Sequence, residues 1–330
     1  MKGHLFNLIV YTHEKRRFDY FHNVIKSFIE KYPCRVIFIR SDNNQNQNFL
    51  EKSKTPEEFL ENSYDLFSIN VSRSLLHKVP FVILPQLIPD LPIYLVWGQN
   101  PISDNEILPQ LQKLATRFVF DSECAKDLKI FSSKMLEKIA NLKIDFMDVS
   151  WAEIGGWRDA IAQTFQSPDK LALLHLINKI VIKYNNLEAG TLRHSAIQAI
   201  YLQGWLAAEL KWGFKSIVQS HTMTLNYESP QSTIEVILQP QIRKTLAQGK
   251  IFEVEFQCTN AVKISMTLAE KQSKVMIYFS TEEKCELPFS LPIQDLSKGL
   301  NAMKEIFYNR TSPHYTDMLN VLKQIPWDVF

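Results

Sequence analysis

Short apolar runs with little alternation dominate the first half of the sequence, and they strongly constrain its fold. The runs are HLFNLIVYT (4–12), CRVIFIR (34–40), PIYLVWG (92–98) and RFVFDS (117–122). Strands with such continuous apolar sequences are typical of a parallel sheet, because helices cover both of its faces. The pattern therefore predicts a Rossmann-like α/β domain with a mostly parallel sheet.

Segments between these runs favour helices. In RRFDYFHNVIKSFIEKY (16–32) apolar residues recur at helical spacing, and TPEEFLENSYDLF (55–67) begins with a capping Thr55 and Pro56. DFMDVSW (145–151) is expected to be a last short strand, and GWRDAIAQTF (156–165) the start of a helix.

The stretch LIPDLPIYLVWGQNP (87–101) combines three prolines with an apolar run that ends in Trp97-Gly98. So many prolines would leave backbone groups unpaired in a lipid bilayer, so the stretch is not expected to span a membrane. Prolines directly before a strand remove no ladder hydrogen bond. We therefore expect a central strand with Trp97 at its carboxyl end, where open α/β sheets place their binding crevices.

The second half has a different pattern. Period-two alternation recurs in SIVQSHTMTLNYE (216–228), TIEVILQP (233–240), KIFEVEFQC (250–258), VKISMTLAE (262–270) and KVMIYFS (274–280). These runs predict an antiparallel meander, preceded by a long helix. Because a single core stops growing near about 250–300 residues, two domains are expected. They are an α/β domain over 1–167 and an α+β domain over 168–330.

Composition excludes several classes of protein. The net charge is +2 over 330 residues, without the basic stripe of a nucleic-acid binder. The four cysteines (Cys34, Cys124, Cys258 and Cys285) form no C-x-x-C pair, and they fit reduced thiols in a cytoplasmic protein better than a disulfide framework. No signal peptide is expected from the short, broken apolar run at the N-terminus.

Motifs that usually hold a cofactor are missing from the sequence. The first β-α turn, YTHEKRR (11–17), has no glycine, whereas a dinucleotide-binding turn needs G-x-G-x-x-G. The sequence has no phosphate-binding P-loop, no G-x-S-x-G elbow and no histidine pair at metal-ligand spacing. We therefore expect no catalytic residue, no cofactor and no metal.

Isolated candidates remain. Gly155-Gly156 before a helix, together with Arg158, could bind a small anion through backbone N–H groups and a cation. The alternative is a loop end with two packed tryptophans, Trp151 and Trp157, and it is favoured over anion binding.

Four ordered motifs resemble one family. LIPDLPIYLVW, RFVFDS, DVSWAEIGGWRDAIAQTF and GWLAAELKW occur in this order between about residues 80 and 212. Together they are similar to the OpcA family, the glucose-6-phosphate dehydrogenase assembly proteins. The resemblance implies a non-enzymatic protein of carbohydrate metabolism, an allosteric activator that binds the dehydrogenase and promotes its active oligomer. That enzyme feeds the pentose phosphate pathway and NADPH supply.

The chain departs from the family pattern at two places. Gly98 replaces the second tryptophan after the strand, and Ala152-Glu153 replaces a Thr-Arg pair. We thus expect a divergent member; if the replaced arginine carries the partner contact in the family, that contact is rewired here.

The resemblance and the residue types together suggest which residues carry the partner contact. These residues are Asp90, Trp97, Asp121, Trp151, Trp157 and Arg158. Tryptophan and arginine are common interface hot spots, and strand ends and helix starts share one side of such a sheet. The motifs LIPDLPIYLVWG (87–98) and GWRDA (156–160) are therefore expected to meet at one surface.

An enzyme remains the alternative. It would act on a sugar phosphate or nucleotide in a crevice near His13, Trp97 and Asp121. For either function, no nucleic acid, membrane or metal partner is expected.

Overall fold

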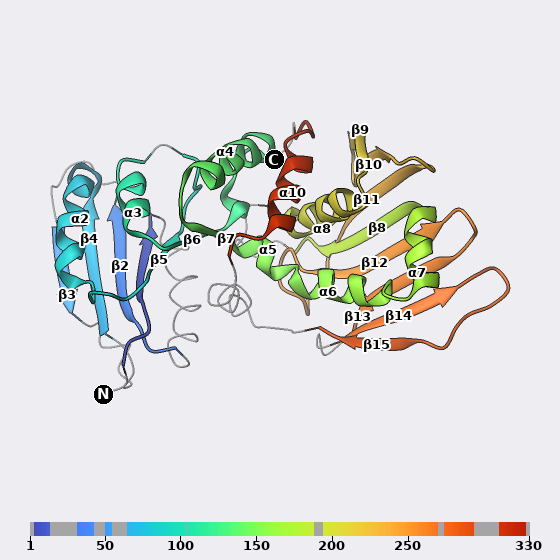
Figure 1. Ribbon diagram of the computed structural model, residues 1–330, viewed down its shortest axis with the longest axis horizontal. Coiled ribbons are helices and arrows are strands. Elements are labelled where there is room, and N and C mark those ends of the chain that lie inside the picture. The colour runs from blue at the N-terminus through green and yellow to red at the C-terminus, as the bar shows by residue number, and fades with distance from the viewer. Residues whose placement is uncertain are drawn as a thin grey trace. The chain divides into compact units, whose positions relative to one another are not determined.

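The computed structural model describes residues 3–13, 32–42, 50–54, 65–103, 105–187, 194–269, 274–293 and 310–327. They belong to two compact units, each built around its own β-sheet (Figure 1). The first unit lies within 1–122, 137–149 and 297–311, and the second within 123–136, 150–296 and 312–330. The helix expected over 16–32 falls almost wholly outside the described residues.

The first unit contains a seven-stranded sheet in the order β3-β4-β2-β1-β5-β6-β7. Its strands are β1 (Asn7–Thr12), β2 (Arg35–Asp42), β3 (Leu50–Lys54), β4 (Asp65–Ser72), β5 (Ile93–Trp97), β6 (Arg117–Phe120) and β7 (Asp145–Asp148). All pairs are parallel except that of β3 with β4. The six parallel strands have the spatial order 3-2-1-4-5-6 of a Rossmann fold, so the predicted mostly parallel sheet is confirmed.

Short helices connect the later strands of this sheet. They are η2 (Arg73–Lys78), α2 (Val79–Ile83), η3 (Leu84–Gln86), α3 (Leu108–Leu114), η4 (Ser122–Cys124) and α4 (Leu128–Asn141).

The strands β3 and β4 were missed in the sequence analysis. Residues 65–67 were assigned to the end of a helix, but they begin β4, in which Ile69 and Val71 are fully buried. The sequence before β4, TPEEFLENSY (55–64), has the signals of a helix start, and the prediction extended that helix too far. The strand is identified by its parallel pairing with β2.

Asn7 explains the proline-rich turn before β5. Its buried side chain accepts a hydrogen bond from the Ile88 N–H (2.8 Å) and donates to the carbonyl oxygens of Ile88 (3.1 Å) and Leu91 (3.4 Å). The Asn7 N–H also donates to the Pro92 carbonyl oxygen at 2.8 Å. Asp90, in this turn, has a φ of 65°. The turn is thus fastened to the start of β1, and β5 enters the sheet with Ile93 opposite Asn7.

The second unit contains an eight-stranded sheet in the order β15-β14-β13-β12-β8-β11-β10-β9. Its strands are β8 (Ile177–Asn185), β9 (Gly213–Gln219), β10 (Met223–Glu228), β11 (Thr233–Gln241), β12 (Ile251–Cys258), β13 (Lys263–Leu268), β14 (Lys274–Ser280) and β15 (Phe289–Pro292). Its helices are α5 (Val149–Glu153), α6 (Gly155–Thr164), α7 (Pro168–Leu173), η5 (Leu174–Leu176), α8 (Ile197–Glu209) and α10 (Pro313–Leu322).

Helices pack on one face of this sheet. The Tyr227 hydroxyl donates to Gln203 Oε1 of α8 at 2.6 Å, and the Phe165 ring meets the Phe256 ring edge-on at 5.4 Å. Gly204 lets α8 approach α10, because a Cβ atom there would lie 2.9 Å from Leu322 Cδ2.

The expected meander is correct only in part. The sheet is mixed, because β8 lies between β12 and β11 and is parallel to β11. Ile180 and Ile182 of β8 are fully buried, which favours a central strand. The run 216–228 forms two strands, β9 and β10, instead of one.

The expected domain boundary at 167 also differs from the observed division. Residues 150–167 belong to the second unit, because Phe165 at the end of α6 packs against Phe256 of β12.

Replacing Asn7 tests the fastening of the turn. Asn7→Ala leaves the half-buried Ile88 N–H without its acceptor, so we expect the free energy of unfolding to fall by about 1–3 kcal/mol. Chemical denaturation measures this loss. Asn141→Ala, at an exposed position, is the control and should change stability by less than about 0.5 kcal/mol. An equally small effect of Asn7→Ala would show that the turn does not depend on the amide.

Candidate functional site

A cavity of about 530 Å³ lies in the first unit, at the carboxyl ends of its parallel strands. Its lining residues are Tyr11, His13, Ser41, Arg73, Leu76, Gln99, Asn105 and Glu106. They follow or end β1, β2, β4 and β5, so the cavity occupies the crevice where Rossmann folds bind ligands.

Two stacked aromatic rings lie beside this cavity. Tyr11 of β1 and Trp97 of β5 are neighbours in register, with ring centroids 4.2 Å apart and an interplanar angle of 11°. Both side chains are buried, and Trp97 is fully inaccessible. Trp97 therefore belongs to the core of the first unit.

A chain of hydrogen bonds leads from the stacked rings to the cavity edge. The Tyr11 hydroxyl and Ser41 Oγ are 3.0 Å apart, and Ser41 Oγ is 3.4 Å from His13 Nδ1. Tyr11 and His13 thus place side chains where a dinucleotide-binding turn has glycines that let the pyrophosphate approach. This crevice is polar and partly filled by the protein's own side chains.

Asp121 and its neighbours follow β6 and are buried. Asp148 at the end of β7 accepts hydrogen bonds from the Ser122 N–H (3.2 Å) and the Ser122 hydroxyl (3.0 Å). Asp121 itself is 3% exposed. It is not among the residues that line the cavity, so it is not grouped with His13 there.

The third family motif forms a contact of its own in the second unit. The Arg158 guanidinium lies 3.6 Å from the centroid of the Trp151 ring and donates to the Trp151 carbonyl oxygen at 3.4 Å. Trp151 and Trp157 are buried, whereas Gly155, Gly156 and Arg158 are half-buried. The two tryptophans are thus packed, and anion binding at the start of α6 stays a prediction.

The predicted partner-binding residues are distributed over both units. Asp90, Trp97 and Asp121 lie in the first unit, and Trp151, Trp157 and Arg158 in the second. Within the second unit the structure brings Trp151 and Arg158 together. Asp90 is exposed, but a common surface for the two motifs stays a prediction.

Sequence reasoning missed Tyr11, Ser41, Arg73 and Gln99, which line the crevice. Each ends or directly follows a parallel strand, and this position was the signal that could have identified them.

The described residues show no further site of two common kinds. None of the described helices combines the length and apolar composition needed to cross a membrane. In the same residues, no three His, Cys, Asp or Glu side chains cluster as a metal site would require.

Family models match both halves of the chain. Residues 26–137 match the glucose-6-phosphate dehydrogenase subunit N-terminal domain, and residues 144–311 match the corresponding C-terminal domain. The chain belongs to the OpcA family. The predicted membership is thereby confirmed.

Two cyanobacterial relatives are named OxPP cycle protein OpcA. The protein of Nostoc punctiforme is 25% identical over 148 residues, which are 45% of this chain and 30% of that protein. The protein of Synechocystis sp. is 26% identical over 142 residues, 42% of this chain and 27% of its own length. The aligned part of this OpcA chain thus covers less than a third of these relatives.

Solved structures share the fold at low identity. KijD10, a 3-ketoreductase from Actinomadura kijaniata, has a TM-score of 0.55 at 8% identity, covering 98% of this chain and 96% of its own. A super-repressor mutant of Gal80p from Saccharomyces cerevisiae has the same TM-score at 9% identity, with coverage of 98% and 95%. These similarities support a Rossmann-like fold for this OpcA chain and carry nothing about its function.

The cysteines differ in accessibility. All four are free thiols; Cys34, Cys124 and Cys258 are buried, and Cys285 is exposed. Burial raises the pKa of Cys34 to about 12 and that of Cys258 to about 11. Since the thiolate is the reactive form, these two buried thiols are poor nucleophiles near neutral pH.

Thiol labelling tests this order of reactivity. In the native protein we expect a fast phase from Cys285 alone, while the other three react only as the protein opens. A colourimetric disulfide reagent measures the phases, and Cys285→Ser should abolish the fast one. Cys258→Ser is the matched control and should leave it intact. Loss of the fast phase in Cys258→Ser would contradict the assignment.

Proposed function

We propose that this chain binds glucose-6-phosphate dehydrogenase and promotes its active oligomer in the oxidative pentose phosphate pathway. The match of both halves of the chain to the two family models carries the proposal. The names of the cyanobacterial relatives support the same pathway. The chain would act in the cytoplasm as an allosteric activator without catalysis of its own, and so support NADPH supply.

The partly filled crevice supports a role in binding rather than catalysis. The Rossmann-like sheet is present, but Tyr11 and His13 side chains stand where cofactor-binding turns have glycines. One fold can serve different functions, since the structures that share it include a ketoreductase and the transcriptional regulator Gal80p.

Activation would follow from unequal binding to two states of the enzyme. If the chain binds the active oligomer about tenfold more tightly than the inactive form, the equilibrium shifts by about 1.4 kcal/mol. Equal affinity for both forms would shift nothing, however tight the binding.

Titration of the enzyme with the purified chain tests the proposal. We expect the rate of NADPH formation to rise and saturate, while sedimentation shows the enzyme in a larger assembly that contains the chain. Enzyme activity and mass that stay constant at all concentrations of the chain would contradict it.

Arg158 is the residue of the third motif best suited to a test. Arg158→Ala should raise the concentration needed for half-maximal activation about tenfold or more, because arginine is a frequent interface hot spot. The substitution also removes the contact with Trp151, so the control variant must lower the melting temperature by a similar amount. Arg243→Ala is the control, because Arg243 stacks on Phe252 at 3.8 Å outside the family motifs. Equal effects of both variants on activation would contradict a specific role for Arg158.

An enzyme that uses the crevice remains the second candidate, and the cavity beside His13 and Arg73 favours it.

Under the proposed function we expect no low-micromolar binding of NADP. The first β-α turn, YTHEKRR (11–17), has no glycine that would let the pyrophosphate approach the backbone. Isothermal titration calorimetry with the chain alone measures this. Tight binding that is lost in Arg73→Ala but kept in Arg117→Ala would support the enzyme instead.

A further inference from the structure

One face of the eight-stranded sheet carries charged side chains at its centre, with polar and apolar side chains between and around them. On this face β8 contributes Lys179, Val181 and Lys183, and β12 contributes Glu253, Glu255 and Gln257. In the part of the chain that the structure describes, helix contacts with this sheet lie on the opposite face, where Phe256 and Tyr227 point.

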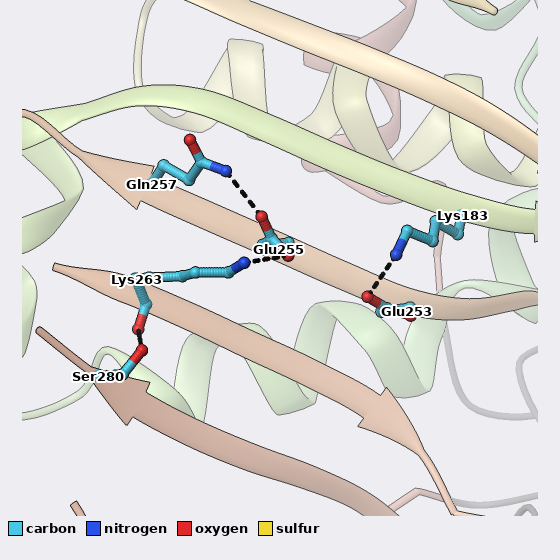
Figure 2. Close-up of polar contacts among 6 residues, drawn as sticks. All are labelled: Lys183, Glu253, Glu255, Gln257, Lys263 and Ser280. Carbon is cyan, nitrogen blue, oxygen red and sulfur yellow. Dashed lines mark hydrogen bonds and ion pairs between the residues drawn. The ribbon is translucent and has the colours of Figure 1, made fainter. Parts of the chain in front are cut away.

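Lysine and glutamate side chains pair along this face. In Figure 2, dashed lines join Lys183 to Glu253 and Lys263 to Glu255. Lys183 Nζ is 2.7 Å from Glu253 Oε1, and Lys263 Nζ is 3.0 Å from Glu255 Oε2. Gln257 Nε2 donates to Glu255 Oε1 at 2.7 Å. Burial tends to raise the pKa of Glu255, but hydrogen bonds from Gln257 and Lys263 and the charges of Lys263 and Lys183 hold it below its usual value. The Glu255 carboxylate is therefore charged at neutral pH.

The centre of the face has no excess charge. Lys179 Nζ pairs with Glu235 Oε2 at 2.8 Å, so the three central lysines are balanced by three glutamates. A strongly acidic or basic partner would gain little from such a surface. The face also presents large apolar side chains to solvent, since Val218 is 58% exposed and Tyr278 43%.

The charges are arranged so that the face complements itself. The midline of the sheet falls between β12 and β8, with four strands on each side. The register places Lys263 and Gln257 of β13 and β12 in one row with Lys179 and Glu235 of β8 and β11. Suppose that a twofold axis, parallel to the strands and along this midline, relates two copies packed face to face. Each strand of one copy then lies opposite the strand of the other copy that is equally far from the midline on its other side. Lys263 of one copy then lies opposite Glu235 of the other.

The next rows fit the same axis. Glu253 lies opposite Lys183 of the second copy, because the two residues face each other across the midline. Between these charged rows, Glu255 meets Val181 and Ser265 meets Ile237. No pair of like charges is brought together in these central positions.

The size of the face is adequate for a dimer. Eight strands spaced about 4.8 Å apart and about 20 Å long cover roughly 750 Å². A stable interface buries about 800 Å² on each partner, and sheets pack face to face about 10 Å apart.

We propose that a second copy of this chain packs on the open face of the eight-stranded sheet, around a twofold axis between β8 and β12. The proposal concerns the chain alone and does not depend on the activation of another enzyme.

Sedimentation velocity of the full chain tests the proposal. We expect a concentration-dependent dimer of twice the monomer mass. Lys263→Glu, and separately Glu235→Lys, should each raise the dissociation constant about tenfold or more by placing like charges opposite each other. Lys134→Glu, an exposed position on α4, is the control with the same change of charge and should have little effect.

The combined variant Lys263→Glu with Glu235→Lys separates contacts between copies from contacts within one chain. It restores opposite charges across the interface, yet it leaves both substituted positions beside a like charge, Glu255 or Lys179, in the same chain. We therefore expect it to dimerise better than either single variant. Failure to recover dimerisation would overturn the proposal, as would a monomeric wild-type chain at high micromolar concentration.

Zero-length crosslinking of the unmodified chain provides a test without substitutions. Lys263 and Glu235 lie on strands three spacings apart, about 14 Å within one sheet, which is too far for a direct amide bond. We expect a Lys263–Glu235 crosslink in the dimer band only, identified by mass spectrometry. Its absence from a crosslinked dimer would show that another surface forms the contact.

Discussion

The buried side chain of Asn7 is the contact on which the arrangement of the first unit depends. Strand β1 pairs with β2 and β5, and its residues are buried throughout. A polar group in that position must be hydrogen-bonded, and Asn7 finds its partners in the backbone of Ile88 and Leu91. The proline-rich turn is thereby held at the amino end of β1, so that β5 runs parallel to it and ends beside the crevice.

At the other end of the same strands, the protein's own side chains occupy space that related folds use for ligands. Tyr11 and Trp97 stack because β1 and β5 are in register, and Ser41 links Tyr11 to His13. The crevice therefore has the position of a Rossmann-fold binding crevice, but its lining differs from a glycine-rich dinucleotide-binding turn. This difference agrees with the proposed role in assembly with another protein, since fold alone does not determine function.

The second unit separates apolar and charged side chains on the two faces of one sheet. Period-two alternation places residues such as Phe256 toward the helices and residues such as Glu255 toward the other side. Because neighbouring strands set lysine beside glutamate, the centre of the open face is neutral, although it is rich in charge. A neutral face with alternating signs suits a partner that carries the same pattern.

Local sequence was sufficient for the types of most described elements and for the family. Continuous apolar runs identified β1, β2, β5 and β6, because a strand buried on both faces needs apolar residues at nearly every position. Alternation identified β10 to β14, because a strand with one buried face needs apolar residues only at every second position. The four ordered motifs identified the OpcA family. The position of Tyr11 at the end of β1 could also have indicated a crevice residue.

Tertiary structure decided the contacts between distant segments. The insertion of β8 between β11 and β12 depends on burying Ile180 and Ile182 between strands that follow much later in the chain. In the same way, stacking on Tyr11 buried Trp97, and stacking beneath Arg158 packed Trp151, whereas Arg158 itself stayed half-buried. Sequence periodicity specifies which face of an element is apolar, but only the packing of separate elements determines what that face meets.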